Sequence, residues 1–260
     1  MAGRGSRFRE QSVVNQEYLK PKPMIKIRKI PLILWAISSY PKNLIKAENL
    51  IFICLEEHQR DFQIGDFLKK YFGSAIKLIF LPEVTRGTAE TALMAEKYLN
   101  DEDVIFSDCD IFFDGNALIT AIQNKSQKVA GILPVIKPKK GELRWSFALI
   151  GEGNRVLEVR EKDPELAARG ALGIIGSYYF SSGNIFVFEA KKMIEENDRS
   201  GTSGKEEFYF SQIYRRLIQS GKKVEAALIS EMWSLDTPQD VDYFLNNFQG
   251  DLSHFDRKRK

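Results

Sequence analysis

The chain has 260 residues, of which 43% are apolar and 28% are charged. This is the composition of an ordinary globular protein, and the length suits one large α/β domain or two small ones. The 38 basic and 35 acidic residues leave a net charge of only +3, which gives no reason to expect a nucleic-acid partner.

Apolar stretches are too short to span a bilayer, and the N-terminus lacks the apolar core of a signal peptide. Cys54 and Cys109 lie in or beside apolar runs, which predicts small residues of buried strands and no disulfide framework. We therefore expect a soluble, cytoplasmic protein without a membrane partner. The oligomeric state stays open, with a homo-oligomer as one alternative. The basic end of segment 251–260 predicts a solvated tail.

The first half of the chain alternates apolar strands with helices. Strands are expected at 50–55, 75–81, 104–106 and 129–135, and helices at 31–40, 62–72, 88–99 and 117–124. Continuous apolar strands between helices predict an α/β fold with a Rossmann-like, mainly parallel (mixed) sheet flanked by helices. Ligands bind such sheets beyond the carboxyl ends of the strands.

The second half of the chain changes character. Strands separated by Gly/Asn turns predict a small antiparallel lobe, and three helices are expected to close the fold. The strands are expected at 145–150, 155–160 and 176–180, and the helices at 186–196, 208–219 and 238–247. Gly201, Ser203 and Gly204 predict a flexible loop. Because no low-complexity linker interrupts the chain, we expect one domain, 1–250, with halves 1–136 and 137–250.

The segment AGRGSRF at 2–8 combines two glycines with two arginines. Gly3 and Gly5 let the backbone approach a phosphate closely, with exposed N–H groups as donors. Arg4 and Arg7 can each bind phosphate oxygens through two parallel hydrogen bonds. A disordered terminus or the remnant of an expression tag has the same composition, so this segment alone leaves both interpretations open.

Two further segments have a binding and a structural interpretation. In KPKPMI at 20–25 the prolines stiffen the backbone and present Lys22 rigidly, although the lysines could simply be solvated. At the strand-to-helix turn 84–89, small residues allow a planar base to lie against the backbone. Capping of the helix by Thr88 without any ligand is the alternative.

Acidic residues follow the apolar strand at 104–106. Asp108 and Asp110 would repel one another there unless a cation neutralised them, and their oxygens suit Mg²⁺ that bridges nucleotide phosphates. An acidic turn without metal is the alternative, and the choice between the two carboxylates stays open. Asp236 is either a second metal ligand or a cap of the helix that begins near Pro238.

Together these segments resemble the sugar-phosphate nucleotidyltransferases, and the resemblance covers nearly the whole chain. Each motif is weak alone, but their order and spacing make the combination specific. The matching elements are AGRGSR (2–7), PKPM (21–24), GTA (87–89), the Asp after the middle strand, VREK (159–162), GSYYF (176–180), EEFY (206–209) and MWSLDTP (232–238).

The resemblance implies a GT-A-type, Rossmann-like fold and a Mg²⁺-dependent enzyme. Such an enzyme transfers the nucleoside monophosphate of an NTP to a small phosphorylated acceptor and releases pyrophosphate. Sugar 1-phosphates are the usual acceptors, and phosphorylated alcohols or amines such as phosphocholine are used by relatives of similar length. The implied context is nucleotide-sugar and surface-polysaccharide biosynthesis, while the base of the NTP and the acceptor stay open.

The resemblance also implies roles for individual residues. Arg7 would neutralise charge as the acceptor phosphate attacks the α-phosphorus, and Lys22 would bind phosphates beside it. Because that phosphate is already a nucleophile, positioning and electrostatic stabilisation suffice. The implied nucleotide-binding residues are Ala2, Gly3, Gly5, Ser6, Gly87, Thr88 and Ala89. The implied metal ligand is Asp110 or Asp108, with Asp236 as a further candidate, and the implied acceptor-binding residues are Glu161, Lys162 and Gly176.

One departure concerns the start of the chain. The family's Gly-rich loop follows a buried first strand, whereas Met1 directly adjoins the loop here, so we expect a truncated first strand that continues upstream. Two other functions stay open. A glycosyltransferase of the related nucleotide-sugar-binding fold would use Asp108 and Asp110 as an Asp-x-Asp metal motif. A non-catalytic, nucleotide-binding regulatory protein is favoured only by the truncated start.

Overall fold

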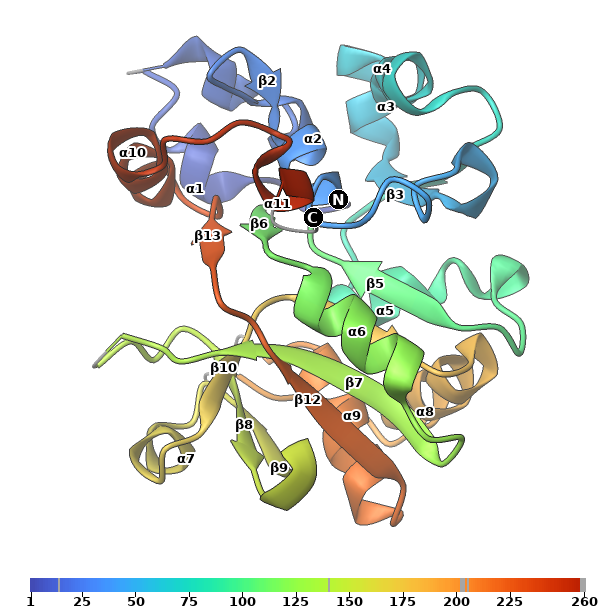
Figure 1. Cartoon of the computed structure of the whole chain (residues 1–260). Coiled ribbons are helices and arrows are strands. Elements are labelled where there is room, and N and C mark those ends of the chain that lie inside the picture. Colours follow the sequence, from blue (N-terminus) through green and yellow to red (C-terminus); the bar gives the residue numbers. More distant parts are fainter. Residues whose placement is uncertain (14, 140, 202–203, 205, 258–260) are drawn as a thin grey trace. The chain divides into compact units, whose positions relative to one another are not determined.

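Figure 1 shows the chain as a computed structural model. It describes residues 1–13, 15–139, 141–201, 204 and 206–257. Ser203 of the expected loop and residues 258–260 of the expected basic tail lie outside the described residues. Contacts divide the chain into two compact units. The first comprises Met1–Val84, Asp108–Asn116 and Glu231–Lys260, and the second Thr85–Ser107 and Ala117–Ser230.

The described part of the first unit contains short helices and strands that pair two by two (Figure 1). Strands β3 and β4 pair in parallel, whereas β1 pairs with β2 and β6 with β13 in antiparallel fashion. Its helices are α1 (Ser6–Arg9), α2 (Leu32–Ile37), α3 (Glu56–Phe62), α4 (Ile64–Phe72), α10 (Pro238–Asn247) and α11 (His254–Arg257). Its strands are β1 (Lys26–Ile27), β2 (Ile30–Pro31), β3 (Ile51–Leu55), β4 (Lys77–Leu81), β6 (Ile111–Phe113) and β13 (Met232–Ser234).

Trp35 lies at the centre of one core of this unit. The side chain is fully buried, and its Nε1 donates a hydrogen bond to the carbonyl of Ile27 at 3.3 Å. The indole packs edge-on against Phe112, Phe244 and Phe248, with ring centroids 5.2 to 5.9 Å apart. These contacts join α2, β6 and α10, because aromatic rings favour such edge-to-face packing.

The second unit is built on one larger sheet. Among the described residues, seven strands pair in the order β5-β11-β7-β10-β8-β9, and β12 pairs in parallel with β7. The strands are β5 (Val104–Ser107), β7 (Val129–Ile136), β8 (Ser146–Ile150), β9 (Val156–Glu161), β10 (Leu172–Ile174), β11 (Ser177–Phe180) and β12 (Lys223–Leu228). The helices are α5 (Thr88–Leu93), α6 (Asn116–Asn124), α7 (Pro164–Ala168), α8 (Gly183–Glu195) and α9 (Phe210–Gln219).

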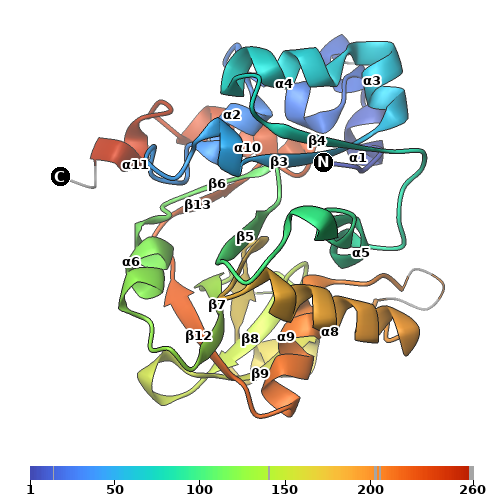
Figure 2. The same ribbon diagram turned by 90° about the vertical axis from the view of Figure 1, so that its right-hand side faces the viewer.

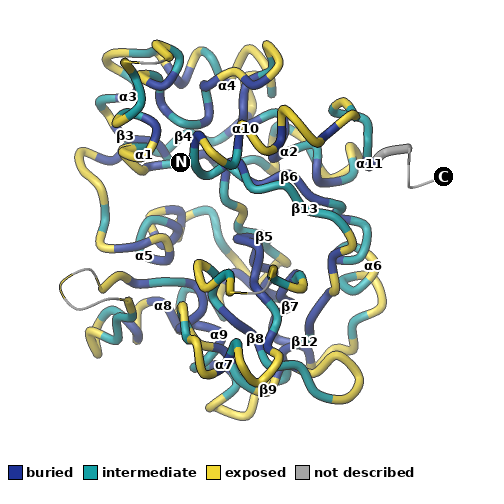
Figure 3. The backbone as a smooth tube through the Cα atoms, turned by 90° about the vertical axis from the view of Figure 1, so that its left-hand side faces the viewer, coloured by how far each residue is buried: buried dark blue, intermediate teal, exposed yellow. Residues whose placement is uncertain are grey.

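Strand β7 is the central strand of this sheet. Its sequence is VAGILPVI, and all but the last residue are buried, as the dark tube in Figure 3 shows. Helices α8 and α9 lie on one side of β7 and β12, and α6 lies on the other side (Figure 2). Since both faces are covered, a continuous apolar run suits this strand better than an alternation of apolar and polar residues.

The expected mixed α/β fold is confirmed. Parallel pairing is found in β3–β4 and β7–β12, whereas the other pairs of the large sheet are antiparallel. Cys54 and Cys109 are buried and free; Cys54 lies in strand β3 as predicted, whereas Cys109 lies in the turn after β5 and not in a strand. Within the described part of the chain, no helix is long and apolar enough to cross a membrane.

Candidate functional site

The Gly-rich segment is a packed part of the first unit. Gly5 adopts a left-handed conformation (φ 63°), and its carbonyl accepts hydrogen bonds from the backbone N–H groups of Phe8 and Arg9. Phe8 is buried and packs edge-on against Tyr18, with ring centroids 5.0 Å apart. A Cβ at Gly3 or Gly5 would meet no atom within 4 Å. The loop is therefore anchored through Phe8 while both glycines border open space.

Lys22 binds two carboxylates in the same unit. It begins the 3₁₀ turn Lys22–Met24, and only 17% of its side chain is exposed. Its Nζ lies 2.6 Å from Oδ2 of Asp110 and 2.7 Å from Oδ1 of Asp236. Asp236 also forms an ion pair with the more exposed Arg7. The structure thus brings together four residues that the sequence assigns to phosphate or metal binding.

The pairing of β6 with β13 explains this arrangement. Asp110 directly precedes β6, and Asp236 lies two positions after the end of β13, so the two carboxylates reach the same end of the ribbon. The register places Ser234 opposite Ile111, and the backbone N–H of Leu235 donates to the carbonyl of Asp110 at 2.8 Å. Side chains far apart in sequence are therefore fixed side by side by backbone hydrogen bonds.

Ionisation of the cluster follows from these contacts. Burial alone would lower the pKa of Lys22, but Asp110 and Asp236 outweigh it and raise that pKa. Burial likewise opposes ionisation of Asp236, yet Lys22 and Arg7 hold the pKa of its carboxyl below the usual value. Asp110 is therefore next to a cation that stays charged at neutral pH.

Asp108 behaves differently from its neighbours. Burial, and then the nearby carboxylate of Asp110, raise the pKa of Asp108 from 3.8 to about 7. The folded state holds this proton more tightly than the unfolded chain does. The protonated carboxyl therefore stabilises the fold below about pH 4, and this contribution is lost as the pH rises toward 7.

This shift gives a testable pH dependence. Between pH 5 and pH 8 the unfolding free energy of the unsubstituted protein should fall by about 1–3 kcal/mol more than that of Asp108→Asn, which cannot ionise at this position. Urea unfolding at both pH values measures the difference. Parallel pH profiles for the two proteins would contradict a raised pKa at Asp108.

The carboxylates of this cluster are few for a metal site built from protein ligands alone. The described residues contain no group of three or more His, Cys, Asp or Glu side chains arranged to hold a metal ion. However, Mg²⁺ at nucleotide sites commonly uses only one or two carboxylates together with phosphate oxygens and water. Asp110 and Asp236, which share one cationic partner, fit that requirement.

In the second unit, the GTA turn is fixed by the segment before α9. The N–H of Ala89 donates to the carbonyl of Phe208, and the N–H of Phe208 donates to the carbonyl of Arg86, both at 3.0 Å. A Cβ at Gly87 would lie within 2.8 Å of the Phe208 carbonyl carbon, so close approach requires glycine here. Thr88 is the first residue of α5 and does not cap it: Gly87 holds the cap position.

The VREK segment ends β9 with a buried acid and a partly exposed base. The side chain of Glu161 is only 4% exposed, and its Oε2 accepts hydrogen bonds from the hydroxyls of Ser146 and Ser211. The Nζ of Lys162 lies 3.6 Å from Glu161 Oε1 and 5.1 Å from the ring centroid of Tyr209. Gly176, the third expected acceptor-binding residue, has a φ of 72° in the turn before β11.

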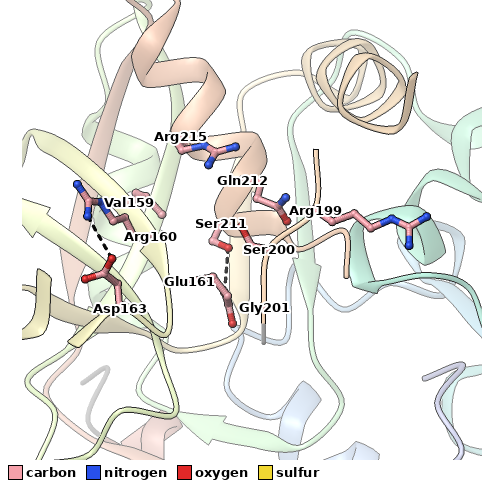
Figure 4. A pocket seen from close by; sticks show the side chains of 10 residues that line it. All are labelled: Val159, Arg160, Glu161, Asp163, Arg199, Ser200, Gly201, Ser211, Gln212 and Arg215. Atoms are coloured by element: carbon pink, nitrogen blue, oxygen red, sulfur yellow. Dashed lines mark hydrogen bonds and ion pairs between the residues drawn. The ribbon is translucent and has the colours of Figure 1, made fainter. Parts of the chain in front are cut away.

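A polar cavity of about 340 Å³ lies beside Glu161 within this unit. Its walls come from β9, α9 and the segment before the EEFY motif (Figure 4). Figure 4 shows Ser211 joined to Glu161, and Arg160 joined to Asp163. The lining residues are Val159, Arg160, Glu161, Asp163, Arg199, Ser200, Gly201, Ser211, Gln212 and Arg215.

Sequence reasoning missed the hydroxyls that hold Glu161 and gave Tyr209 no role of its own. Ser146 begins β8 directly opposite Glu161, a relation that appears only when the register of β8 and β9 is known. Ser211 lies in the first turn of α9, and serine is too common there to stand out. Tyr209 lies at the N-cap of α9, two residues before Ser211. This neighbourhood is the signal that could have drawn attention to Ser211.

Comparison with known proteins places the fold. Neither a protein-family model nor a curated protein matches the sequence. A nucleoside-diphosphate-sugar pyrophosphorylase from Vibrio cholerae RC9 is 22% identical, with a TM-score of 0.73 over 95% of this chain and 98% of that chain. The inositol-1-phosphate CTP transferase from T. maritima is 16% identical, with a TM-score of 0.68 over 96% of this chain and 95% of that one.

A third solved structure agrees with these two. A UDP-glucose pyrophosphorylase complexed with UDP-glucose is 15% identical, with a TM-score of 0.69 over 95% of each chain. All three are sugar-phosphate nucleotidyltransferases, and each match extends over nearly the full length of both chains. The expected resemblance is therefore confirmed at the level of structure: this chain has the fold of the sugar-phosphate nucleotidyltransferases.

Proposed function

We propose that the protein is a nucleotidyltransferase that joins the nucleoside monophosphate of an NTP to a small phosphorylated acceptor, with a sugar 1-phosphate as the expected acceptor class. The observation that carries this proposal is the cluster of Arg7, Lys22, Asp110 and Asp236 in the first unit. Two cations and two carboxylates suit a triphosphate and its metal ion. The fold of the chain, shared with enzymes of this class, supports the same conclusion.

In the proposed reaction, an oxygen of the acceptor phosphate attacks the α-phosphorus of the NTP. The bond between the α-phosphorus and the bridging oxygen to the β-phosphorus breaks, and pyrophosphate leaves with that oxygen. Arg7 and Lys22 would bind the phosphate oxygens and stabilise the charge that builds up between the two groups. A bound Mg²⁺, held by Asp110 and Asp236, would supply further charge neutralisation at those oxygens.

The second unit would supply selectivity for the base and the acceptor. Within the GTA turn at the start of α5, Thr88 is the exposed residue, and a planar base could lie against the backbone there. Lys162, with 45% of its side chain exposed, is available to bind the acceptor phosphate. Neither role needs a nucleophilic side chain, because the acceptor phosphate itself attacks.

Pyrophosphate release from purified protein tests this proposal. The assay should cover the four common NTPs with a panel of sugar 1-phosphates and phosphorylated alcohols and amines, with Mg²⁺ and with excess chelator. We expect release that requires both an acceptor and Mg²⁺. Turnover of a nucleotide-sugar without pyrophosphate release would instead indicate a glycosyltransferase, and nucleotide binding without any turnover would indicate a regulatory protein.

A further inference from the structure

Lys22 holds the position of a counter-ion within the charged cluster of the first unit. Its Nζ lies 2.6 Å from Oδ2 of Asp110 and 2.7 Å from Oδ1 of Asp236. The side chains of Lys22 and Asp110 are only 17% and 16% exposed. Carboxylates that are so little hydrated need a cationic partner, and here the chain itself supplies one.

Asp110 and Asp236 are also the residues proposed to hold Mg²⁺. An ion bound to the same two oxygens would lie against the ammonium of Lys22, and two cations at such short range repel one another. Because the ammonium and the Asp110 carboxylate are largely buried, solvent and salt screen this repulsion less than they would at the surface. Lys22 and Mg²⁺ therefore compete for one pair of carboxylates.

The backbone at Lys22 is fixed, whereas its side chain can turn. Pro21 and Pro23 flank the residue and are both buried, and the N–H of Ile25 donates to the Lys22 carbonyl at 3.1 Å. The ammonium stands at the end of a flexible four-carbon stem, 5.5 Å from the ring centroid of Phe8. Rotation about this stem redirects the ammonium without a change in the proline-stiffened turn.

Arg7 is the more accessible cation of the cluster. Its side chain is 62% exposed and forms an ion pair with Asp236. A phosphate group that approaches from solvent can bind Arg7 before it reaches the more buried Lys22. Its oxygens then offer Lys22 a new anionic partner, which compensates for the loss of the contacts with Asp110 and Asp236.

We propose that Lys22 is the built-in counter-ion of Asp110 and Asp236, and that it keeps Mg²⁺ from these carboxylates until a triphosphate draws the ammonium away. This inference rests on the proposed function and concerns the order in which its site is filled. Mg²⁺ would reach the two carboxylates together with the triphosphate or after it, and not before. Lys22 thus opposes the metal ion in the absence of nucleotide and binds phosphate in its presence.

The first test measures metal binding without any reaction. Mn²⁺ replaces Mg²⁺ as the probe, because the free ion is counted directly by electron paramagnetic resonance. Without nucleotide, Lys22→Met should bind Mn²⁺ about 10-fold or more tightly than the unsubstituted protein, since the competing charge has gone. Lys20→Met, which removes a lysine outside the cluster, should bind as weakly as the unsubstituted protein.

Two results of this titration would overturn the proposal. One is equal Mn²⁺ affinity in Lys22→Met and the unsubstituted protein. The other is a gain in affinity that persists in the double variant Lys22→Met/Asp110→Asn, because the additional ion would then lie away from the cluster. Loss of the gain in the double variant is the expected result.

The second test uses the unsubstituted protein, so it remains valid if Lys22→Met does not fold. NMR of protein with ¹⁵N-labelled lysine detects ammonium groups that carboxylates hold, and the Lys22 signal is assigned by its loss in Lys22→Arg. Mg²⁺ alone should leave this signal in place, whereas Mg²⁺ with the α,β-methylene analogues of the four common NTPs should shift it. Displacement of the signal by Mg²⁺ alone would overturn the proposal, as would an unchanged signal with Mg²⁺ and an analogue both bound.

The two proposals fail in different ways. If the unsubstituted protein releases no pyrophosphate with any pair of substrates, the proposed function is wrong, and the Mn²⁺ titration still decides whether Lys22 competes with the metal ion. If the unsubstituted protein is active and Lys22→Met binds Mn²⁺ no more tightly, the counter-ion role alone is wrong. Lys22→Met is expected to gain metal affinity while it loses activity, a combination that a merely structural role for Lys22 would not produce.

Discussion

Lys22→Met should lower kcat/KM for pyrophosphate release by about 100-fold or more, the size of effect seen when a preorganised electrostatic group is removed from an active site. The ammonium of Lys22 lies between Asp110 and Asp236, within hydrogen-bond distance of both carboxylates. Without it, two negative side chains would face the incoming triphosphate, and one cation that binds phosphate oxygens would be missing. Steady-state kinetics with the best NTP and acceptor measures the loss.

Two variants separate this effect from a loss of folding. Lys20→Met removes a lysine from the same loop that pairs with Glu17 and not with the cluster, so it should retain near-normal activity. Arg7→Gln removes a cation whose side chain is 62% exposed, and the stability cost of such an exposed ion pair is small. Arg7→Gln should therefore fold normally and still lose activity. Normal kcat/KM in both Lys22→Met and Arg7→Gln would show that the cluster is not catalytic.

Trp35→Ala should lower the free energy of unfolding by about 3–5 kcal/mol, the usual cost of truncating a fully buried large aromatic side chain. The substitution removes the edge-on contacts with Phe112, Phe244 and Phe248 and the hydrogen bond to Ile27. Because these contacts join three elements of the first unit, neighbouring side chains cannot easily close the cavity. Urea unfolding followed by circular dichroism measures the change.

Tyr243→Ala is the matched control for this prediction. Tyr243 lies on α10, one residue before Phe244, but 51% of it is exposed, so its loss should cost under about 1 kcal/mol. A similarly small cost for Trp35→Ala would contradict the tight packing of the aromatic core.

Elements with strong apolar patterns were predicted well from sequence. The runs that became β3 and β7 carry no charged residue, the run that became β4 is apolar apart from Lys77, and each strand appears within two residues of its expected bounds. Helix α10 begins at Pro238 and ends at Asn247, as expected, because Thr237 caps it and proline suits its first position. Local sequence decides such elements, so no knowledge of tertiary contacts is needed.

Other elements depend on tertiary contacts. The helix expected at 62–72 is α4, which begins at Ile64, and the helix α3 before it was not expected; Gln63, in a left-handed conformation (φ 51°), separates the two. Strands β6, β10 and β13 have only three residues each, which is too short to show an alternation of apolar and polar residues. Strand β12 has a mixed sequence, KVEAAL, and is a strand because β7 offers it a parallel partner.

The site was predicted through motifs more than through geometry. Lys22, Asp110 and Asp236 were singled out from the sequence, but their contact depends on the β6–β13 pairing, which the sequence did not reveal. The roles of the individual residues stay predictions until activity is measured. The hydroxyls of Ser146 and Ser211 were missed altogether, because serine carries no pattern that marks it as a partner of Glu161.

The order of synthesis gives the β6–β13 pairing a further importance. The ribosome makes Asp110 long before Asp236, and every residue of the second unit is made between or before them. The second unit can therefore begin to fold while the first still lacks the strand that completes its cluster of charges, since units of a chain fold as they emerge. Until Met232–Ser234 leaves the ribosome and pairs with β6, the nascent chain has no Asp236 beside Lys22. The cluster of charges is thus a late product of translation.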